Sequence, residues 1–460
     1  MAKTRKWLGS RQFYQMTLGI ALPIMVQNGI STFVNLLDNL MVGRLGTEAM
    51  SGVSIVNQFL FIFNLVVFGA VSAAGIFMAQ FHGKGDREGE MYTFRFKFLV
   101  CLAVGLIGTA VMWAFHDSFI RLFLYSDGGG GDLELTFAEG KKYLYVMLAG
   151  LLPFAIANAY GSSMRETGDT VTPMVASIAA VAANFVLNYL LIFGSFGAPR
   201  LEVRGAAIAT VVSRFLELAI LVVRTHVKAG KYGYIRSAFR SFRIPLRLFR
   251  DISLRGLPLI ANEGLWSLAV TLTNQCYATR GLDVVAASNI YSTIWNLFSV
   301  VFLSMGNAIA IVLGNQLGAG KLEEAKDTSR RLIGFSIFCS VLTAAVMASI
   351  SGVFPLLYNT TDGVRELATY MIRVAAIMMP CSAFTNAAYF TIRSGGKVFV
   401  TMLFDSVFMW VVLMPIVFGF SRLTDIGIHP LFAIGVGTEF LKCLLGAFML
   451  HRGTWVKQLA

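Results

Sequence analysis

PIMVQNGI, at residues 23–30, opens the stretch of sequence that decides the fold, because the chain repeats this stretch. Residues 23–85 align without a gap with residues 258–320, which begin PLIANEGL, at a constant shift of 235 positions. Three glycine pairs coincide in this alignment: Gly46 with Gly281, Gly83 with Gly318, and Gly85 with Gly320. Further matches follow in the same order at slightly smaller shifts. The chain therefore contains two related halves.

The composition indicates a membrane protein. Hydrophobic residues make up 56% of the chain and charged residues only 14%, and the mean hydropathy is +0.68. A soluble fold of this composition would leave apolar surface that it could not cover. Duplication in so apolar a chain is typical of transporters, in which two similar halves can rock about a central site.

Twelve apolar stretches of about 20 residues or more can each cross a bilayer as a helix. They lie at residues 18–42, 52–80, 96–116, 143–163, 172–195, 205–227, 255–279, 286–314, 332–356, 368–391, 398–420 and 429–451. We therefore expect an all-α integral membrane protein with twelve transmembrane helices in two pseudo-symmetric six-helix bundles around a central cavity. The expected bundles are residues 1–227 and 251–460, and a basic cytoplasmic linker at 228–250 joins them.

The distribution of Lys and Arg predicts the orientation in the cell membrane. Basic residues at the edges of a span are counted here with the adjoining loop, namely Lys97, Arg224, Arg255 and Arg373. On this count the termini and the even-numbered loops hold 26 of the 38 basic residues, whereas the odd-numbered loops hold 10. Basic loops stay preferentially on the cytoplasmic side, so we expect both termini to be cytoplasmic. The net charge of +13 is then a topology signal spread over membrane-flanking loops, and it gives no reason to expect a nucleic-acid partner.

The central linker region is the most basic part of the chain. Nine Lys and Arg residues between 224 and 255 face a single acid, Asp251. Within it, the segment from Phe242 to Arg250 mixes apolar and basic residues. Such a segment can lie on an anionic inner leaflet, and it can equally be a solvated connector that obeys the charge rule.

Charges inside the expected spans are few, and each is expensive in a membrane, at about 2.5–3.5 kcal/mol or more at its centre. Arg214 and Glu217 are three residues apart in the sixth span, and Glu439 and Lys442 are three apart in the twelfth. Residues at this spacing share a helix face, so we expect each pair to neutralise itself in an architectural role.

Three further acids, Asp38, Glu263 and Asp405, have no basic neighbour within a helical turn on their own spans. A carboxylate without a counter-charge must take up a proton or a cation to be tolerated in a membrane, which makes Asp38 and Glu263 candidates for ion coupling. Asp405 can alternatively stabilise a polar helix contact.

Amide side chains accompany the first of these acids. Asn35 lies one turn before Asp38, and Asn184 and Asn188 share one face of the fifth span. Amide and carboxylate oxygens are the ligands that a hard cation such as Na⁺ requires, so Asp38 and Asn184 are candidate metal ligands. The alternative for the asparagines is hydrogen bonding between helices.

At these residues the chain resembles the MATE (multidrug and toxic compound extrusion) transporters over nearly its whole length. The resemblance rests on several motifs that are specific in combination. They are Pro23 to Gln27, Asp38 to Gly46, the paired loops Ala79 to Asp86 and Gly314 to Gly320, Arg165 to Thr170 before Pro173 and Met174, Asn184 to Gly194, and Gly205 to Thr210.

The resemblance implies two six-helix bundles that open alternately to either side and export cationic amphiphiles in exchange for H⁺ or Na⁺. It implies that Asp38 and Glu263 are the coupling acids of the two bundles, and that Asn184, Asn188 and Thr210 are polar positions near the first acid. The chain departs from some members of the family in two ways. Asn188 stands where they have Asp, and the tenth span offers Ser382, Thr385 and Asn386 where they have an acid.

An exchange mechanism follows from electrostatics. A coupling ion on the carboxylate weakens its hold on a cationic substrate, and loss of that ion restores the negative charge. We expect a substrate pocket that contains Asp38, Glu263 and Asp405, with Trp266 and Trp295 in its wall, since aromatic rings suit apolar cations. The alternative for either Trp is lipid or core packing. No cofactor is expected, and we expect a monomer whose partners are cationic small molecules and membrane lipid.

Three other functions compete with drug export. A lipid or polysaccharide flippase of the same superfamily would share the frame but would need more cationic residues in its cavity. A major-facilitator carrier also has two six-helix halves, but only residues 83–87 echo its loop motif. An enzyme is disfavoured, because the five histidines lie at or near span ends without a catalytic cluster, and the five cysteines lack disulfide or metal spacing.

Overall fold

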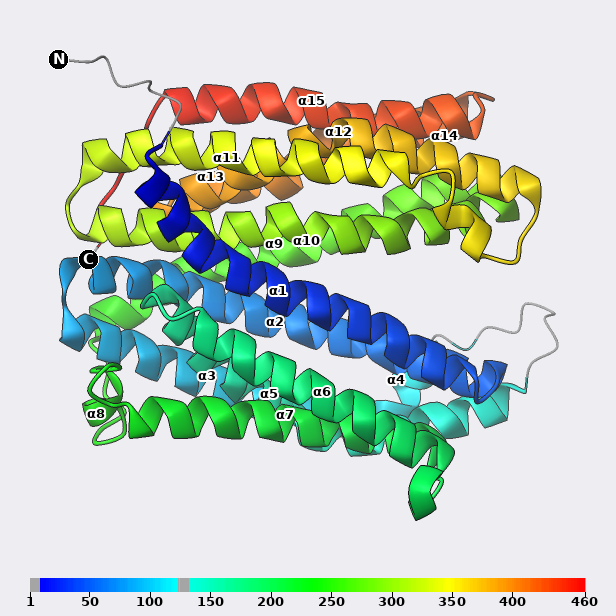
Figure 1. The fold of residues 1–460 in the computed structure, drawn as a ribbon, viewed down its shortest axis with the longest axis horizontal. Coiled ribbons are helices and arrows are strands. Elements are labelled where there is room, and N and C mark those ends of the chain that lie inside the picture. Colours follow the sequence, from blue (N-terminus) through cyan, green and yellow to red (C-terminus); the bar gives the residue numbers. More distant parts are fainter. Residues whose placement is uncertain (1–8, 123, 125–131, 460) are drawn as a thin grey trace. The chain divides into compact units, whose positions relative to one another are not determined.

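The computed structural model describes residues 9–122, 124 and 132–459, and this part of the chain is helical without strands (Figure 1). The long helices of the first half are α1 (Arg11–Gly43), α2 (Thr47–Lys84), α3 (Arg87–Ala114), α5 (Leu133–Glu166), α6 (Val171–Phe193) and α7 (Glu202–Val227). Those of the second half are α9 (Leu246–Ala278), α10 (Leu282–Gly318), α11 (Leu322–Ser349), α12 (Asp362–Ser394), a continuous segment from α13 (Val398–Met402) to α14 (Met414–Leu423), and α15 (Ile428–His451). Two short helices, α4 (His116–Leu122) and α8 (Ile235–Ala238), lie between them.

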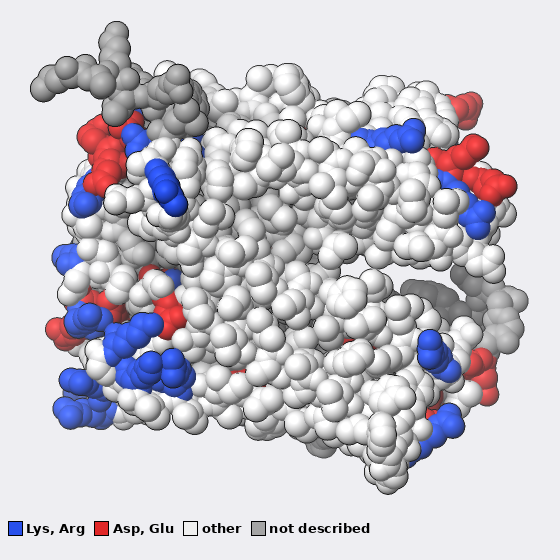
Figure 2. Space-filling view, in the orientation of Figure 1, with Lys and Arg blue, Asp and Glu red and all other residues white. Residues whose placement is uncertain are grey.

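Each expected membrane span coincides with one of these helices, and most of the helices extend beyond the apolar stretch at one or both ends. Within the described residues, eleven helices are long and apolar enough to cross a membrane. The remaining long helix, α9, has 33 residues, but it carries basic residues in its first turns and Glu263 further along. On the face shown in Figure 2, charged side chains gather over the ends of the long helices, and their middle stretches are nearly free of charge.

The internal repeat is visible in backbone conformation as well as in sequence. Gly46 and Gly281, which coincide in the repeat, have φ values of 123° and 122° and precede α2 and α10. Gly85 and Gly320 follow the same two helices, with φ values of 78° and 75°. A side chain strongly disfavours this half of conformational space, so glycine is required at corresponding points of both copies.

The described chain separates into two compact units. Unit 1 comprises Met1–Met25, Ala79–Gly85 and Leu257–Ala460, and unit 2 comprises Val26–Met78 and Asp86–Gly256. Three helices, α1, α2 and α9, each contribute residues to both units. The expected domain limits at residues 227 and 251 stay a prediction.

Inside unit 1, the last turns of α2 and α10 approach each other closely. A Cβ atom added at Gly83 would lie 1.9 Å from the carbonyl oxygen of Asn315, and one added at Gly318 would lie 1.8 Å from the carbonyl oxygen of Gln80. Because Gln80 coincides with Asn315 in the repeat and Gly83 with Gly318, the two contacts are copies of each other. Only the absence of side chains permits this crossing.

The crossing is held by the end of the chain, which also belongs to unit 1. The fully buried amide of Gln80 donates to the carbonyl oxygen of Ser394 at 2.9 Å and accepts from the backbone N–H of Leu459 at 2.7 Å. Gln458 donates to the carbonyl oxygen of Gly318 at 2.9 Å. The C-terminal segment is thereby tied to the ends of α2, α10 and α12.

In unit 2, a buried carboxylate fixes the segment that follows α7. Asp169, in the turn between α5 and α6, accepts from Lys231 Nζ at 2.6 Å, from the Tyr232 hydroxyl and from the backbone N–H of Thr172. Burial alone would raise the pKa of Asp169, but the hydrogen bonds from Lys231, Tyr232 and Thr172 outweigh this effect and lower its pKa to about 2. The start of the linker is therefore attached to unit 2.

Candidate functional site

Asp38 lies in unit 2 on α1, where its carboxylate meets the polar face of α6. Asn188 Nδ2 donates to Asp38 Oδ1 at 2.6 Å and to Asn184 Oδ1 at 3.1 Å. Asn184 Nδ2 in turn donates to Thr210 Oγ1 of α7 at 3.3 Å. The structure thus brings four of the residues expected from the sequence into one network, because the i, i+4 spacing of the two asparagines places them on one helix face.

The oxygen atoms of this network suit a small cation. One terminal atom of the Asn184 amide lies 3.0 Å from Asp38 Oδ2 and 3.2 Å from Oδ1, and only one of the two amide orientations places a donor there. In the other orientation, which is the one that makes the hydrogen bonds given above, Asn184 Oδ1 and the two carboxylate oxygens of Asp38 converge. Asn188 Oδ1 is also buried without a hydrogen-bond partner in the described chain. A proton or a Na⁺ ion at Asp38 would stabilise the close approach of the Asp38 and Asn184 oxygens.

Asn35, which the sequence predicted as a member of this network, lies apart from it. Tyr143 and Asn57, which were not predicted, lie near it. Asn35 is exposed, and no hydrogen bond joins it to Asp38 among the residues described. Tyr143 of α5 interacts electrostatically with Asp38, and its hydroxyl donates to Asn57 of α2 at 3.4 Å. Neither Tyr143 nor Asn57 carries a charge at neutral pH, so the pattern of charges within the spans could not predict them.

Glu263 lies in unit 1 on α9, next to the buried side chain of Asn262. It interacts electrostatically with Arg393 of α12 and with Asp405. Asn262 Nδ2 donates to Asp405 Oδ2 at 3.1 Å. The structure thus brings Glu263 and Asp405 into one polar region of unit 1.

The expectation that Asp405 is unpaired is wrong. Lys442 of α15 donates to Asp405 Oδ1 at 2.7 Å, and both side chains are largely buried. Lys442 therefore forms its ion pair with Asp405 and not with Glu439, whose carboxylate instead accepts from the Thr385 hydroxyl. Spacing along one helix could not reveal a partner that comes from another helix.

The backbone around Asp405 is also unusual. Residues Leu403–Val407 and Met409–Leu413 form two consecutive π-helical stretches between α13 and α14. Ser406, within the first stretch, donates to both the carbonyl oxygen and Oδ1 of Asn262 at 2.7 Å. Such widened turns are frequent at functional sites, and this one directs two adjacent polar side chains toward α9.

In the sixth span, the contacts of Arg214 also differ from the simple pair with Glu217 that the spacing predicts. The guanidinium of the half-buried Arg214 donates to the carbonyl oxygen of Gly150 at 3.3 Å and lies over the ring of Phe154, 4.9 Å from its centroid. Glu217 interacts electrostatically with both Arg165 and Arg214. These contacts join α7 to α5 and agree with an architectural role.

Another buried charge, on α3, is not expected from the sequence. Lys97 of α3 has a fully buried side chain and forms an ion pair with Glu166 of α5. It also donates to Ser162 at 3.1 Å and to Ser163 at 3.4 Å. Lys97 lies at the edge of its apolar stretch, where a basic residue looks like an ordinary flanking charge.

The two tryptophans expected in the substrate pocket differ in their surroundings. Trp295 of α10 packs against Tyr291 and Phe302, with ring centroids 6.1 and 5.9 Å apart. Trp266 of α9 is 38% exposed. The packing of Trp295 agrees with the alternative of a core residue, and neither contact pattern tests a role in substrate binding.

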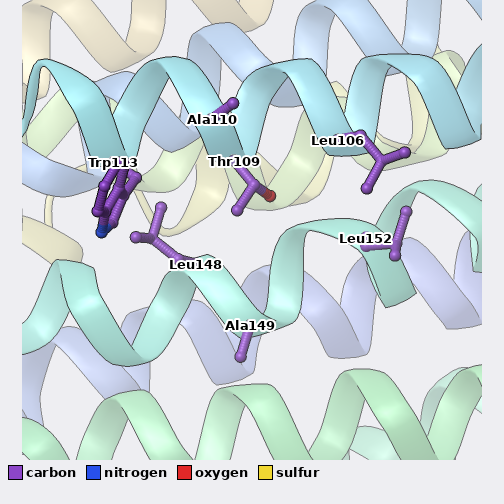
Figure 3. Close-up of a pocket in the computed structure, with 7 residues that line it drawn as sticks. All are labelled: Leu106, Thr109, Ala110, Trp113, Leu148, Ala149 and Leu152. Carbon is purple, nitrogen blue, oxygen red and sulfur yellow. The ribbon is translucent and has the colours of Figure 1, made fainter.

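Unit 2 also contains an open apolar cavity of about 440 Å³, and none of the residues that line it belongs to the polar networks described above (Figure 3). Leu106 and Trp113 of α3 face Leu148 and Leu152 of α5 across it. Its wall contains no charged side chain.

The described residues contain no group of three or more His, Cys, Asp or Glu side chains that could hold a metal ion.

Comparison with known proteins agrees with the duplicated fold. The MatE family model matches residues 23–190 and again residues 258–418, so its two matches begin at the two prolines where the repeat opens. Among similar curated proteins, the probable multidrug resistance protein NorM of Thermotoga maritima is 23% identical over 95% of this chain and 92% of its own length. The NorM of Deinococcus radiodurans is 26% identical over 95% and 94%.

Solved structures of MATE proteins share the fold. A MATE transporter in the straight conformation superposes with a TM-score of 0.86 at 20% identity, covering 99% of both chains. An outward-facing multidrug resistance MATE transporter of the MOP superfamily gives a TM-score of 0.85 at 21% identity over 98% of this chain and 99% of its own. These matches confirm the expected twelve-helix membrane fold.

The family match covers most of the chain and extends through both halves, and the fold match covers nearly all of it. The family match and the curated relatives identify a transporter, which confirms the expectation that the protein is not an enzyme. The chain therefore belongs to the MatE family, with the fold of the MATE transporters.

Proposed function

We propose that the protein is a secondary active antiporter that exports cationic amphiphilic compounds by alternating access in exchange for H⁺ or Na⁺. The observation that supports this most directly is the Asp38 network. It places a carboxylate on α1 against two amides of α6, and one buried oxygen, on Asn188, has no donor in the described chain. Curated relatives named as probable multidrug resistance proteins agree with a drug as the exported compound.

Competition for one carboxylate provides the coupling. When Asp38 holds H⁺ or Na⁺, its charge is neutralised and its attraction for a cationic substrate is lost. When the ion leaves, the negative charge returns and favours binding of the next substrate. Asn184 and Asn188 would hold a Na⁺ ion through their oxygens, or would reorient around a protonated acid, so the same residues fit either ion.

Glu263 is the proposed coupling acid of unit 1. Lys442 already neutralises Asp405, so Asp405 is expected to shape the site and to bind substrate only if that ion pair opens. Glu263 has no such lysine partner within 4 Å in the described chain, although Arg393 contributes to its field. We therefore expect the hydrogen bonds around Glu263 to decide whether it binds H⁺ or Na⁺.

The proposed setting is the cell membrane, with both termini on the cytoplasmic side and the protein acting as a monomer. The exposed basic side chains of the linker support this orientation, because basic segments are retained on that side. The fold itself does not fix the charge of the substrate. A structure of a Pyrococcus furiosus transporter with the same fold, at a TM-score of 0.84 and 20% identity over 98% of this chain and 99% of its own, was described as having a binding pocket of reverse polarity that suggests a different function.

Transport into proteoliposomes would test the proposal. The purified protein is reconstituted, and uptake of a fluorescent organic cation is followed under an imposed Na⁺ gradient and then under an imposed pH gradient. We expect one gradient to drive uptake and its collapse to abolish uptake. Transport of a labelled lipid head group in place of the cation, with no response of the cation to either gradient, would favour the flippase and contradict the proposal.

A further inference from the structure

The linker between the two sequence halves carries an exposed basic and aromatic surface within unit 2. We propose that this surface binds the anionic head groups of phospholipids in the membrane leaflet on its side. The surface consists of Arg236, Phe239, Arg240, Phe242, Arg243, Leu246, Arg247, Phe249 and Arg250, all of them exposed, and it is called the linker surface below. The proposal depends on the membrane location of the protein and not on which ion or substrate it transports.

A buried arginine of α3 fixes the shape of this surface. The guanidinium of Arg95, which is 5% exposed, donates to the carbonyl oxygens of Ser237 at 2.6 Å, Ala238 at 2.7 Å and Arg243 at 3.0 Å. These three bonds hold the end of α8 and the turn that follows it. The arginines of the linker are thus displayed on a fixed backbone and not on a free loop.

Aromatic contacts set the position of the same segment along α3. Phe239 packs edge-on against Phe98 with centroids 5.3 Å apart, and Phe242 stacks on Phe98 at 6.3 Å. Phe249, in the first turn of α9, packs against Phe96 at 5.4 Å. Phe239, Phe242 and Phe249 nevertheless remain 39%, 50% and 44% exposed, so each ring has one face on α3 and another that is free for a lipid.

These contacts place the linker rings at the depth of the membrane interface. Phe98 lies eleven residues after the start of α3 at Arg87, or about 16 Å along the helix at 1.5 Å per residue. The apolar stretch expected to enter the membrane core begins at residue 96, so Phe96 and Phe98 lie near its boundary. Aromatic rings favour this boundary, and arginines beside them can extend into the head groups.

The charge of the region is strongly one-sided. Between residues 224 and 255, nine basic residues face one acid, Asp251, which is half-buried. Asp169, in the turn between α5 and α6, is buried and already bonded to Lys231 and Tyr232 of the linker. The exposed arginines therefore form a positive surface beside apolar rings, which complements an anionic head group above acyl chains.

Titration of lipid onto the intact protein would test this assignment. The full chain in neutral detergent is stripped of lipid and titrated with phosphatidylglycerol or with phosphatidylcholine of the same acyl chains, and bound lipid is counted by native mass spectrometry. We expect preferential binding of phosphatidylglycerol. Replacement of Arg240, Arg243 and Arg247 together by Gln should weaken that binding on the order of 100-fold, at about five-fold per arginine, and leave phosphatidylcholine unaffected.

A matched triple variant distinguishes this surface from general positive charge. Three basic residues at the start of α11 serve for comparison: Lys321 and Arg330, which are exposed, and Lys326, which is half-buried. Each lies next to an acid at 2.6–3.2 Å. Their replacement by Gln should leave phosphatidylglycerol binding within two-fold. The proposal is overturned if the linker variant binds phosphatidylglycerol as the wild type does, or if the α11 variant loses as much.

Thermal unfolding provides a second measurement that does not depend on counting lipids. Phosphatidylglycerol should raise the Tm of the wild type, because a ligand that binds only the folded state stabilises it. The linker variant should have the same Tm as the wild type in pure detergent and should not respond to phosphatidylglycerol. An equal rise in Tm for both proteins would contradict the proposal.

Discussion

Asn188 Nδ2 lies 2.6 Å from Asp38 Oδ1, which joins the amide of α6 to the carboxylate of α1 across 150 residues of sequence. Among the described residues, no Lys or Arg lies within 4 Å of this carboxylate. The acid is therefore held by an amide and not by a positive charge, which agrees with the proposed exchange of a cation at this position. This relationship underlies the first prediction.

Asp38→Asn should reduce transport of an organic cation at least ten-fold, because the amide cannot exchange H⁺ or Na⁺. Uptake into proteoliposomes is measured at equal protein incorporation. Asp283→Asn, at an exposed position in the first turn of α10, is the matched control and should transport normally. Full transport by Asp38→Asn would remove Asp38 from the coupling mechanism.

Glu263→Gln is expected to impair transport while leaving the amount of folded protein unchanged. Glu263 interacts with Asp405 and Arg393, and the neutral amide preserves its size but not its charge. The ratio of coupling ions to substrate, measured from the reversal potential of transport, should fall relative to the wild type. An unchanged ratio would show that coupling does not pass through this acid.

Breaking the Asp405 and Lys442 ion pair should destabilise the protein more than removing it entirely. Lys442→Met leaves a buried carboxylate uncompensated and should cost about 3–5 kcal/mol. The double variant Lys442→Met with Asp405→Asn should recover much of this loss. Thermal unfolding in detergent is compared for Lys442→Met, for Asp405→Asn and for the double variant. If the effects of the two single variants simply add in the double variant, the two residues are not coupled.

Alanine at either glycine of the α2 and α10 crossing should lower the Tm and the yield of folded protein. A Cβ at Gly83 or Gly318 would approach a carbonyl oxygen to less than 2 Å, so the backbone must move apart. Gly334 of α11 is the control, because a Cβ there meets no atom within 4 Å. Gly334→Ala should leave the Tm unchanged or slightly higher.

Asp169→Asn should destabilise unit 2 by about 2 kcal/mol at neutral pH, since the hydrogen bonds from Lys231 and Tyr232 lose their charged acceptor. The pKa of Asp169 is about 2 in the folded protein, below the value of about 4 in an unfolded chain. Its contribution is therefore complete above about pH 4 and is lost as the pH falls toward 2. The difference in Tm between wild type and variant should be constant from pH 5 to 8 and should shrink below pH 4. A difference that already shrinks at pH 6 would contradict this assignment.

The fold could be predicted from the sequence almost completely. Apolar stretches longer than a bilayer crossing and a repeat shift that holds over residues 23–85 leave few alternatives, and each stretch became a helix. The Asp38 network was also accessible, because the two asparagines of α6 share a face at i, i+4 spacing.

Partners that come from other helices could not be predicted. Nothing in the sequence near Asp405 indicates that Lys442 would reach it, because the pair depends on how α15 packs against the π-helical segment. The intrahelical pair expected from spacing is weak and easily replaced by a partner with better geometry. Lys97 escaped notice for a related reason, since its burial is decided by α5.

The glycine crossing of α2 and α10 also limits how the two gene copies can diverge. After a duplication, each copy is ordinarily free to accumulate substitutions on its own. Here the main chain of one copy is the steric boundary of the other, since Gly83 abuts Asn315 and Gly318 abuts Gln80. A larger residue in one copy cannot be rescued by a smaller one in its counterpart, because the obstacle is backbone in both directions. Both copies must therefore keep glycine at this point, however far their remaining sequences drift.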